Sequence, residues 1–194
     1  KNGTVDPAIK RDNLQDWLDY ILMYYGRGTL LKEWYISPSA MSNEEWKGLC
    51  LTDNWARNHR GALSHTVFVG GRPDEGHPYG YIGWDMHTKT ATLTVRNPKA
   101  TGQILDIPFD LSTGYTGPKD AHYVAEVEYP YRAMYPAEFT AGQTMHLTIP
   151  GYATMAFEIK KGKTIVSKVA LPKVDFHNVE GDPFQIVLNV PGDV

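Results

Sequence analysis

Apolar and polar residues alternate with a period of two along the stretch Tyr79–Pro98, YGYIGWDMHTKTATLTVRNP. Successive side chains of a strand point to opposite faces, so the pattern predicts two strands that each present one apolar face. The apolar positions are Gly80, Ile82, Trp84 and Met86, then Ala91, Leu93 and Val95. The polar segment His87-Thr88-Lys89 lies between the strands, and Asn97-Pro98 ends the second because proline cannot donate a ladder hydrogen bond. We therefore expect a β-hairpin here.

The same alternation continues after this hairpin, in segments that glycine and proline residues separate. The apolar sets that would share a face are Leu105, Ile107 and Phe109; Tyr123, Ala125, Val127, Tyr129 and Tyr131; Met145, Leu147 and Ile149; and Ala153, Met155, Phe157 and Ile159. After a turn at Lys161-Gly162, one more strand is expected over Thr164–Val169. Half-polar strands at this spacing predict an antiparallel, Greek-key-like β-sandwich.

The chain before the hairpin has a helical period instead. Apolar residues recur at helical spacing from Leu14 to Tyr25, and Asp6-Pro7 is a typical helix start. Ser42 and Glu45 form a capping-box pattern that opens a second helix, which we expect to continue to about Leu63. The apolar run Thr29–Ile36 between the helices predicts a short strand, as in an α/β unit.

These patterns predict a mainly β fold: an antiparallel β-sandwich preceded by a helical α/β segment. The expected divisions are residues 1–65 for the helical segment and residues 66–170 for the sandwich. Residues 171–194 would form extra strands or the start of a further domain.

Composition excludes several function classes. The 194 residues carry 19 Lys and Arg against 22 Asp and Glu, without a basic stripe, so no nucleic-acid partner is expected. No apolar run approaches the length of a membrane span, so no membrane partner is expected. The single cysteine excludes an intrachain disulfide. This fits a reducing compartment but also suits a secreted or periplasmic bacterial domain without disulfides.

The sequence predicts neither a cofactor nor a metal site. The seven histidines show no H-E-x-x-H or H-x-H spacing, and no Gly-x-Ser-x-Gly or Walker-type loop occurs. Glu126 and Glu128 lie two apart on one strand face, as a carboxyl pair could, but a strand face that also bears His122 is more often solvated. Cys50 is expected to be a buried, inert thiol on an apolar helix face.

The segment Tyr129–Pro136, YPYRAMYP, is unusually rich in tyrosine. Tyr131 and Tyr135 are candidates to bind a sugar through their flat rings. The alternative, which we favour, is that Tyr129 and Tyr131 continue the core face of their strand, which would leave only Tyr135 free.

The order of these parts resembles a known family. LLKEWYISP, a capped helix with W-x-x-L and NWA, YGYIGW, TLTVRNP and PGYATMAFEI together resemble the C-terminal end of TIM-barrel glycoside hydrolases of the α-galactosidase (melibiase-like) type, over roughly residues 10 to 160. The resemblance implies that residues 1–63 are the tail of the barrel. It also implies that the two catalytic aspartates lie on earlier barrel strands, so this chain alone would not be catalytic and its sandwich would brace the catalytic barrel of the same protein.

The resemblance also places one strand near a sugar site. Barrel active sites form where the strands end, so Glu33, Trp34 and Tyr35 are candidates to line a carbohydrate site in the complete protein. The alternative is that Trp34 and Tyr35 pack the barrel edge. Two other functions stay open: a carbohydrate-binding module that uses Tyr131 and Tyr135, and a protein-interaction domain that docks through the Leu14–Tyr25 stripe.

Overall fold

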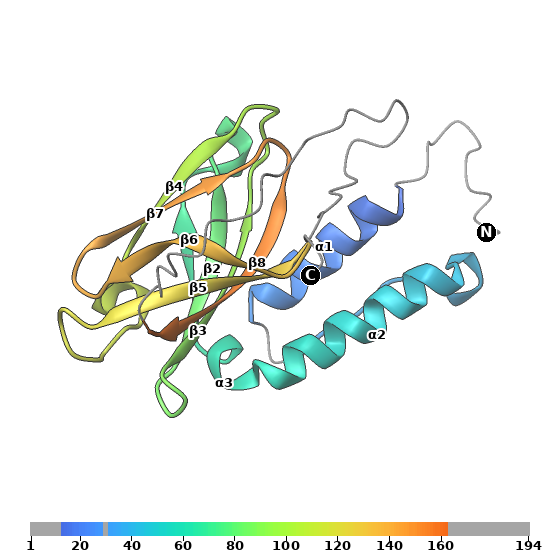
Figure 1. Ribbon diagram of the computed structural model, residues 1–194. Helices are drawn as coiled ribbons and strands as arrows, with labels where there is room; N and C mark the ends of the chain where they lie inside the picture. Colours follow the sequence, from blue (N-terminus) through green and yellow to red (C-terminus); the bar gives the residue numbers. More distant parts are fainter. Residues whose placement is uncertain (1–12, 29–30, 163–194) are drawn as a thin grey trace, which may run out of the picture. The chain divides into compact units, whose positions relative to one another are not determined.

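The structure is a computed structural model that describes residues 13–28 and 31–162 of the chain (Figure 1). Over these residues the fold is mainly β, with antiparallel strands in two sheets and three α-helices that precede them, so the predicted fold class is confirmed. The expected helix start at Asp6-Pro7, the strand over Thr164–Val169 and the segment 171–194 lie outside the described residues.

The helices are α1 (Leu14–Gly26), α2 (Asn43–Asn58) and the short α3 (Arg60–Leu63). Both long helices begin with a capping box. Ser42 and Glu45 form the predicted box of α2, and Asn13 and Asp16 form one at α1. Each box satisfies backbone N–H groups that a helix start leaves without partners. The two helices pack side by side (Figure 1).

The larger sheet has six strands in the order β1-β2-β3-β8-β5-β6, and the smaller pairs β4 with β7. The strands are β1 (Thr66–Gly70), β2 (Tyr79–Asp85), β3 (Thr90–Arg96), β4 (Gln103–Pro108), β5 (His122–Tyr129), β6 (Ala133–Thr140), β7 (Thr144–Ile149) and β8 (Thr154–Lys161). Short 3₁₀ turns lie at Pro38–Ala40, Pro73–Glu75 and Leu111–Thr113. All the described strand pairs are antiparallel.

The predicted hairpin is confirmed as β2 and β3, which pair from Tyr79↔Arg96 to Asp85↔Thr90. Its apolar positions inside the two strands are buried, as predicted. Thr92 and Thr94 on the opposite face are buried too, because α1 and α3 pack against this hairpin. Both faces of the hairpin are therefore covered, and only one was predicted to be.

The core lies between the two sheets. The predicted inner residues of β4, β7 and β8, and those of β5 as far as Val127, lie in or against one continuous cluster that also includes the inner residues of β2 and β3. At one end Trp84 stacks on Phe109, with ring centroids 5.0 Å apart, and meets Tyr115 and Tyr123 edge-on. Such aromatic pairs add stability beyond the area that they bury.

The two sheets approach each other along two sides. On one side β6 lies near β7, and the Tyr135 hydroxyl accepts a hydrogen bond of 2.9 Å from the backbone N–H of Thr148. On the other side β1 lies near β4, and an open groove of 630 Å³ separates them.

The predicted strand over Thr29–Ile36 is wrong for the part that the structure describes: residues 31–37 have no regular secondary structure. No described strand lies beside this segment to pair with it. Trp34 and Ile36 instead pack against the apolar cluster of α1 and α2, which includes Ile21 and Tyr25. The apolar residues were recognised correctly, but they serve helix packing.

Candidate functional site

The candidate site is the junction where the helices meet the outer face of the six-stranded sheet. Gly26 of α1 lies directly over Thr94 of β3, and Gly83 of β2 lies against the backbone of Ala62 in α3. A side chain at either glycine would overlap these neighbours. The absence of side chains at these two positions therefore allows both helices to approach the sheet closely.

Glu128 on β5 connects this sheet to α2. Its carboxylate accepts a hydrogen bond of 2.9 Å from the indole N–H of Trp55 and lies 3.3 Å from Nε2 of His59. The other ring nitrogen of His59 lies 2.8 Å from the carbonyl oxygen of Trp55. The side chain of Glu128 is only 10% exposed, so its contacts are shielded from water. Hydrogen bonds to such a charged group are stronger than neutral ones.

Tyr129 connects the next position of β5 to α1. Its hydroxyl donates a hydrogen bond of 2.5 Å to the buried carboxylate of Asp19 and also contacts the amide of Gln15. Burial, together with the hydrogen bond to Asp19, raises the pKa of Tyr129 well above its ordinary value. The hydroxyl therefore stays protonated and keeps donating at pH values near 10, where an ordinary tyrosine ionises.

The other carboxylates on this face are also engaged. Lys160 on β8 contacts Glu126 at 2.7 Å and Glu158 at 3.1 Å. The hydrogen bond from Lys160 lowers the pKa of Glu126. Glu126 and Glu128, the carboxyl pair that the sequence offered, thus bind different partners and hold different elements together.

A polar cavity of 410 Å³ lies beside this junction. Its walls come from α2, α3, β2, β3, β5 and β8 and include His59, Asp85, Glu128, Arg132 and Glu158. Within residues 13–28 and 31–162, no group of three or more His, Cys, Asp or Glu residues could hold a metal ion. None of the helices described is long and apolar enough to cross a membrane.

The candidates Glu33, Trp34 and Tyr35 lie in the irregular segment beside α1. Trp34 is half-buried among four aromatic rings of α1, with its centroid 4.6 Å from that of Tyr24. These rings are Trp17, Tyr20, Tyr24 and Tyr25. Tyr35 is 94% exposed, and its hydroxyl lies 3.2 Å from a carboxylate oxygen of Glu33. Trp34 therefore packs, whereas Glu33 and Tyr35 face solvent.

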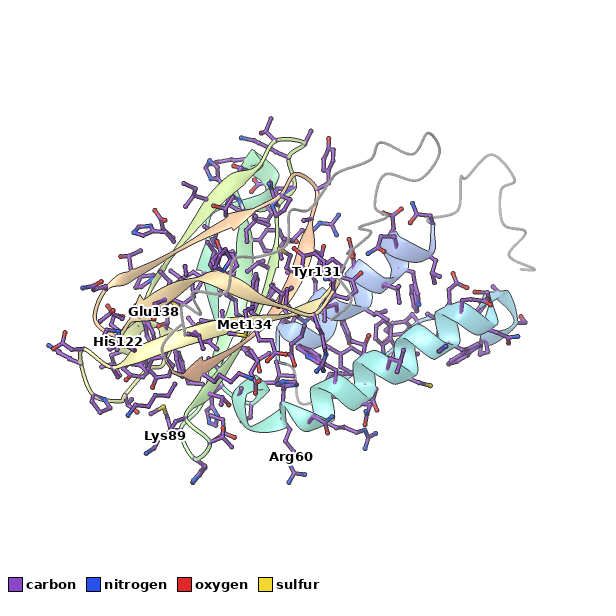
Figure 2. The ribbon with its side chains drawn as sticks, in the orientation of Figure 1. Arg60, Lys89, His122, Tyr131, Met134 and Glu138 are labelled. Atoms are coloured by element: carbon purple, nitrogen blue, oxygen red, sulfur yellow. The ribbon has the colours of Figure 1, made fainter. Side chains whose placement is uncertain are left out.

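The burial of Tyr131 and Tyr135 is the reverse of what the sequence suggested. Figure 2 shows Tyr131 at the tip of the β5–β6 hairpin, where it is 58% exposed, with His122 and Glu138 at the other end. Tyr135 is half-buried, stacks on Phe139 and bonds β7. The favoured expectation that Tyr129 and Tyr131 are core residues and Tyr135 is free is wrong, since Tyr129 contacts α1 and lies outside the core cluster. The reason is a register irregularity between Val127 and Tyr129, which ends the alternation before Tyr131.

The expected burial of Cys50 is also wrong, because this cysteine is exposed. The buried side of α2 runs through Gly48, Leu49 and Ala56, and Cys50 lies beside it. Asp19, Trp55 and His59 were not predicted from the sequence as junction residues. One signal was present for Asp19, an acidic residue that borders the apolar stripe of α1.

Tyr25 on α1 joins α1 to α2 and gives a test at alkaline pH. Its hydroxyl donates to Asp53 at 3.1 Å, and burial followed by the nearby Asp53 charge raises the pKa of Tyr25 to about 12. An unfolded tyrosine ionises near pH 10, so this stabilisation is complete below pH 10 and is lost as the pH rises toward 12.

The free energy of unfolding is therefore expected to fall between pH 10 and pH 12, and to fall less in the Tyr25→Phe variant than in the wild type. Urea titration at each pH measures this difference. The exposed Tyr35→Phe is the control, and an equal effect of both substitutions would contradict this assignment.

The solved structures with a similar fold include two glycoside hydrolases. A protein of Bacillus halodurans C-125 described as an α-N-acetylgalactosaminidase has a TM-score of 0.53 and 12% identity, with 79% of this chain and 32% of that chain covered. α-Galactosidase I of Mortierella vinacea has a TM-score of 0.52 and 10% identity, with 80% of this chain and 38% of that chain covered. No protein-family model and no curated protein sequence matches the chain.

The chain therefore spans only between 32% and 38% of the length of these two structures. At 10–12% identity the likeness is one of fold: the chain shares its architecture with part of two glycoside hydrolases.

Proposed function

We propose that this chain is a non-catalytic portion of an α-galactosidase-like glycoside hydrolase, in which the β-sandwich braces the catalytic barrel of the same protein. The observation that carries the proposal is the junction: buried polar contacts from Glu128 and Tyr129 fix both long helices to the sheet. In this proposal the helices belong to the barrel. The sheet then supports the barrel from outside, and the chemistry lies elsewhere in the protein.

The likeness of fold to two glycoside hydrolases supports the same proposal. The contacts of the carboxylates also support the proposal, since Glu126, Glu128 and Glu158 each bind a partner within the fold. In the complete protein, Glu33 and Tyr35 would contact a carbohydrate beside the barrel, and Trp34 would hold their segment on α1.

A second candidate is a carbohydrate-binding module. Its supporting observation is the exposure of Tyr131 and Tyr35, whose rings are open to solvent. Saturable calorimetric binding of galactosides that is lost in Tyr131→Ala or Tyr35→Ala would favour this candidate. The third candidate, a domain that docks through the Leu14–Tyr25 stripe, is weakened because Ile21, Leu22 and Tyr25 in that stripe are buried.

A glycosidase assay tests the proposal. The isolated chain, shown to be folded by circular dichroism, is expected to release no product from aryl α-galactosides or aryl α-N-acetylgalactosaminides. Turnover above the uncatalysed rate that survives purification to homogeneity would refute a non-catalytic role.

A further inference from the structure

The edge of the six-stranded sheet at β1 differs from the edge at β6. β6 contains Pro136 and the exposed Glu138, and Tyr135 bonds the neighbouring β7. Proline and charge are the usual means by which proteins keep an edge strand from pairing with another chain. The sequence of β1, TVFVG, contains neither. Among the described residues, β1 pairs only with β2, so its outer edge is left without a strand partner.

The surroundings of this edge are accessible and partly apolar, although His77, Gln103 and Asp106 also line the groove. All of β1 except Thr66 lines the open groove toward β4. Phe68 at the centre of β1 is 49% exposed, and Ile104 and Leu111 nearby are also exposed. On the outer face Phe68 stacks on Tyr79 and meets Tyr81 edge-on. An unpaired strand with apolar neighbours favours pairing with another extended strand.

The distribution of charged residues among the strands indicates which extended strand would pair with β1. When two copies of a strand pair antiparallel about a two-fold axis, each residue lies opposite itself or its counterpart, so a charged residue near the centre would meet its own like charge. β6 contains Glu138 and β4 contains Asp106, whereas β1 contains no charge. Pairing about Phe68 would place Phe68 opposite Phe68 and Val67 opposite Val69, so the central contacts would be apolar, and Thr66 would lie opposite Gly70 at each end.

We propose that β1 is a self-association edge, through which two copies of this chain join their six-stranded sheets antiparallel about Phe68. The strand has five residues, so the interface is small. Small interfaces of this kind give weak complexes. The dimer is therefore in equilibrium with monomer, and its fraction rises with protein concentration. This inference does not depend on the function proposed above.

The first test is sedimentation equilibrium of the full chain over a wide concentration series. The average mass is expected to rise from the monomer value toward twice that value. Phe68→Lys places two like charges at the axis and is expected to abolish the rise. The matched control Met134→Lys changes an exposed apolar residue on the other edge strand, β6, and should leave the rise intact. A monomer at every concentration, or an equal effect of both variants, would overturn the proposal.

A cross-link keeps the proposal testable if Phe68→Lys disturbs folding. Directly opposed antiparallel residues have Cα atoms about 4.5–5.5 Å apart, within the range that a disulfide spans. In a Cys50→Ser background, which removes the only native thiol, Phe68→Cys is expected to form a covalent dimer with oxidised glutathione as the oxidant. Met134→Cys in the same background is expected to stay monomeric. Cross-linking through Met134→Cys but not through Phe68→Cys would contradict pairing at β1.

Discussion

Gly83→Ala is expected to lower the free energy of unfolding by about 2–3 kcal/mol, because overpacking a tight contact typically costs this much. The added methyl group would overlap the carbonyl group of Ala62, which is backbone and cannot rotate away. α3 would have to move off β2, and α2 precedes α3 directly in the chain. Urea denaturation followed by tryptophan fluorescence measures the change.

Gly102→Ala is the matched control for this prediction. A methyl group at Gly102 would have its nearest neighbour, the carbonyl oxygen of Ile149, at 3.7 Å, an ordinary contact distance. We expect this variant to change stability by no more than about 0.5 kcal/mol. Equal losses in the two variants would show that close approach of α3 to the sheet is not what Gly83 provides.

Glu128→Ala is expected to lower the free energy of unfolding by about 3 kcal/mol, because removing one partner from a buried polar group leaves the others without hydrogen bonds and still desolvated. This is the second of the two largest expected effects. Here the indole N–H of Trp55 and the imidazole of His59 would both lose their carboxylate. Glu128→Gln is expected to recover part of the loss, since its amide oxygen can still accept from Trp55. The same urea titrations measure both variants.

A second histidine–carboxylate pair provides the control for Glu128. His146 and Asp106 lie 2.7 Å apart, but their side chains are 66% and 63% exposed. Exposed ion pairs contribute little, so Asp106→Ala is expected to cost less than about 1 kcal/mol. If the exposed pair proved as costly to break as the buried one, burial would not explain the importance of Glu128.

Most strands of the sandwich could be predicted from the sequence because each has an apolar face toward the core, whereas β6 was not predicted as a strand. Leu93, Leu147 and Phe157 are all fully buried, and each belongs to a period-two pattern that is visible without a structure. The start of α2 was predictable for a similarly local reason, since Ser42 and Glu45 are only three residues apart. Patterns of this kind depend on neighbours along the chain.

The junction could not be predicted because its contacts join distant parts of the chain. Asp19 and Tyr129 are 110 residues apart, and Trp55 and Glu128 are 73 apart. The outer face of β5 has the polar residues of a solvated face, but α2 partly covers it and Glu128 becomes an anchor. The segment after residue 30 was misassigned for a related reason: an apolar run of this length suits a strand or a helix-packing segment equally.

Native-state hydrogen exchange tests most directly whether the sandwich supports the helices. If the junction joins them into one cooperative unit, the slowest amides of α1 and α2 will exchange with the same opening free energy as those of β3 and β8. Glu128→Ala would then lower all four values together. Helices that exchange at a clearly lower free energy, while the sheet stays fully protected in the wild type, would contradict the account.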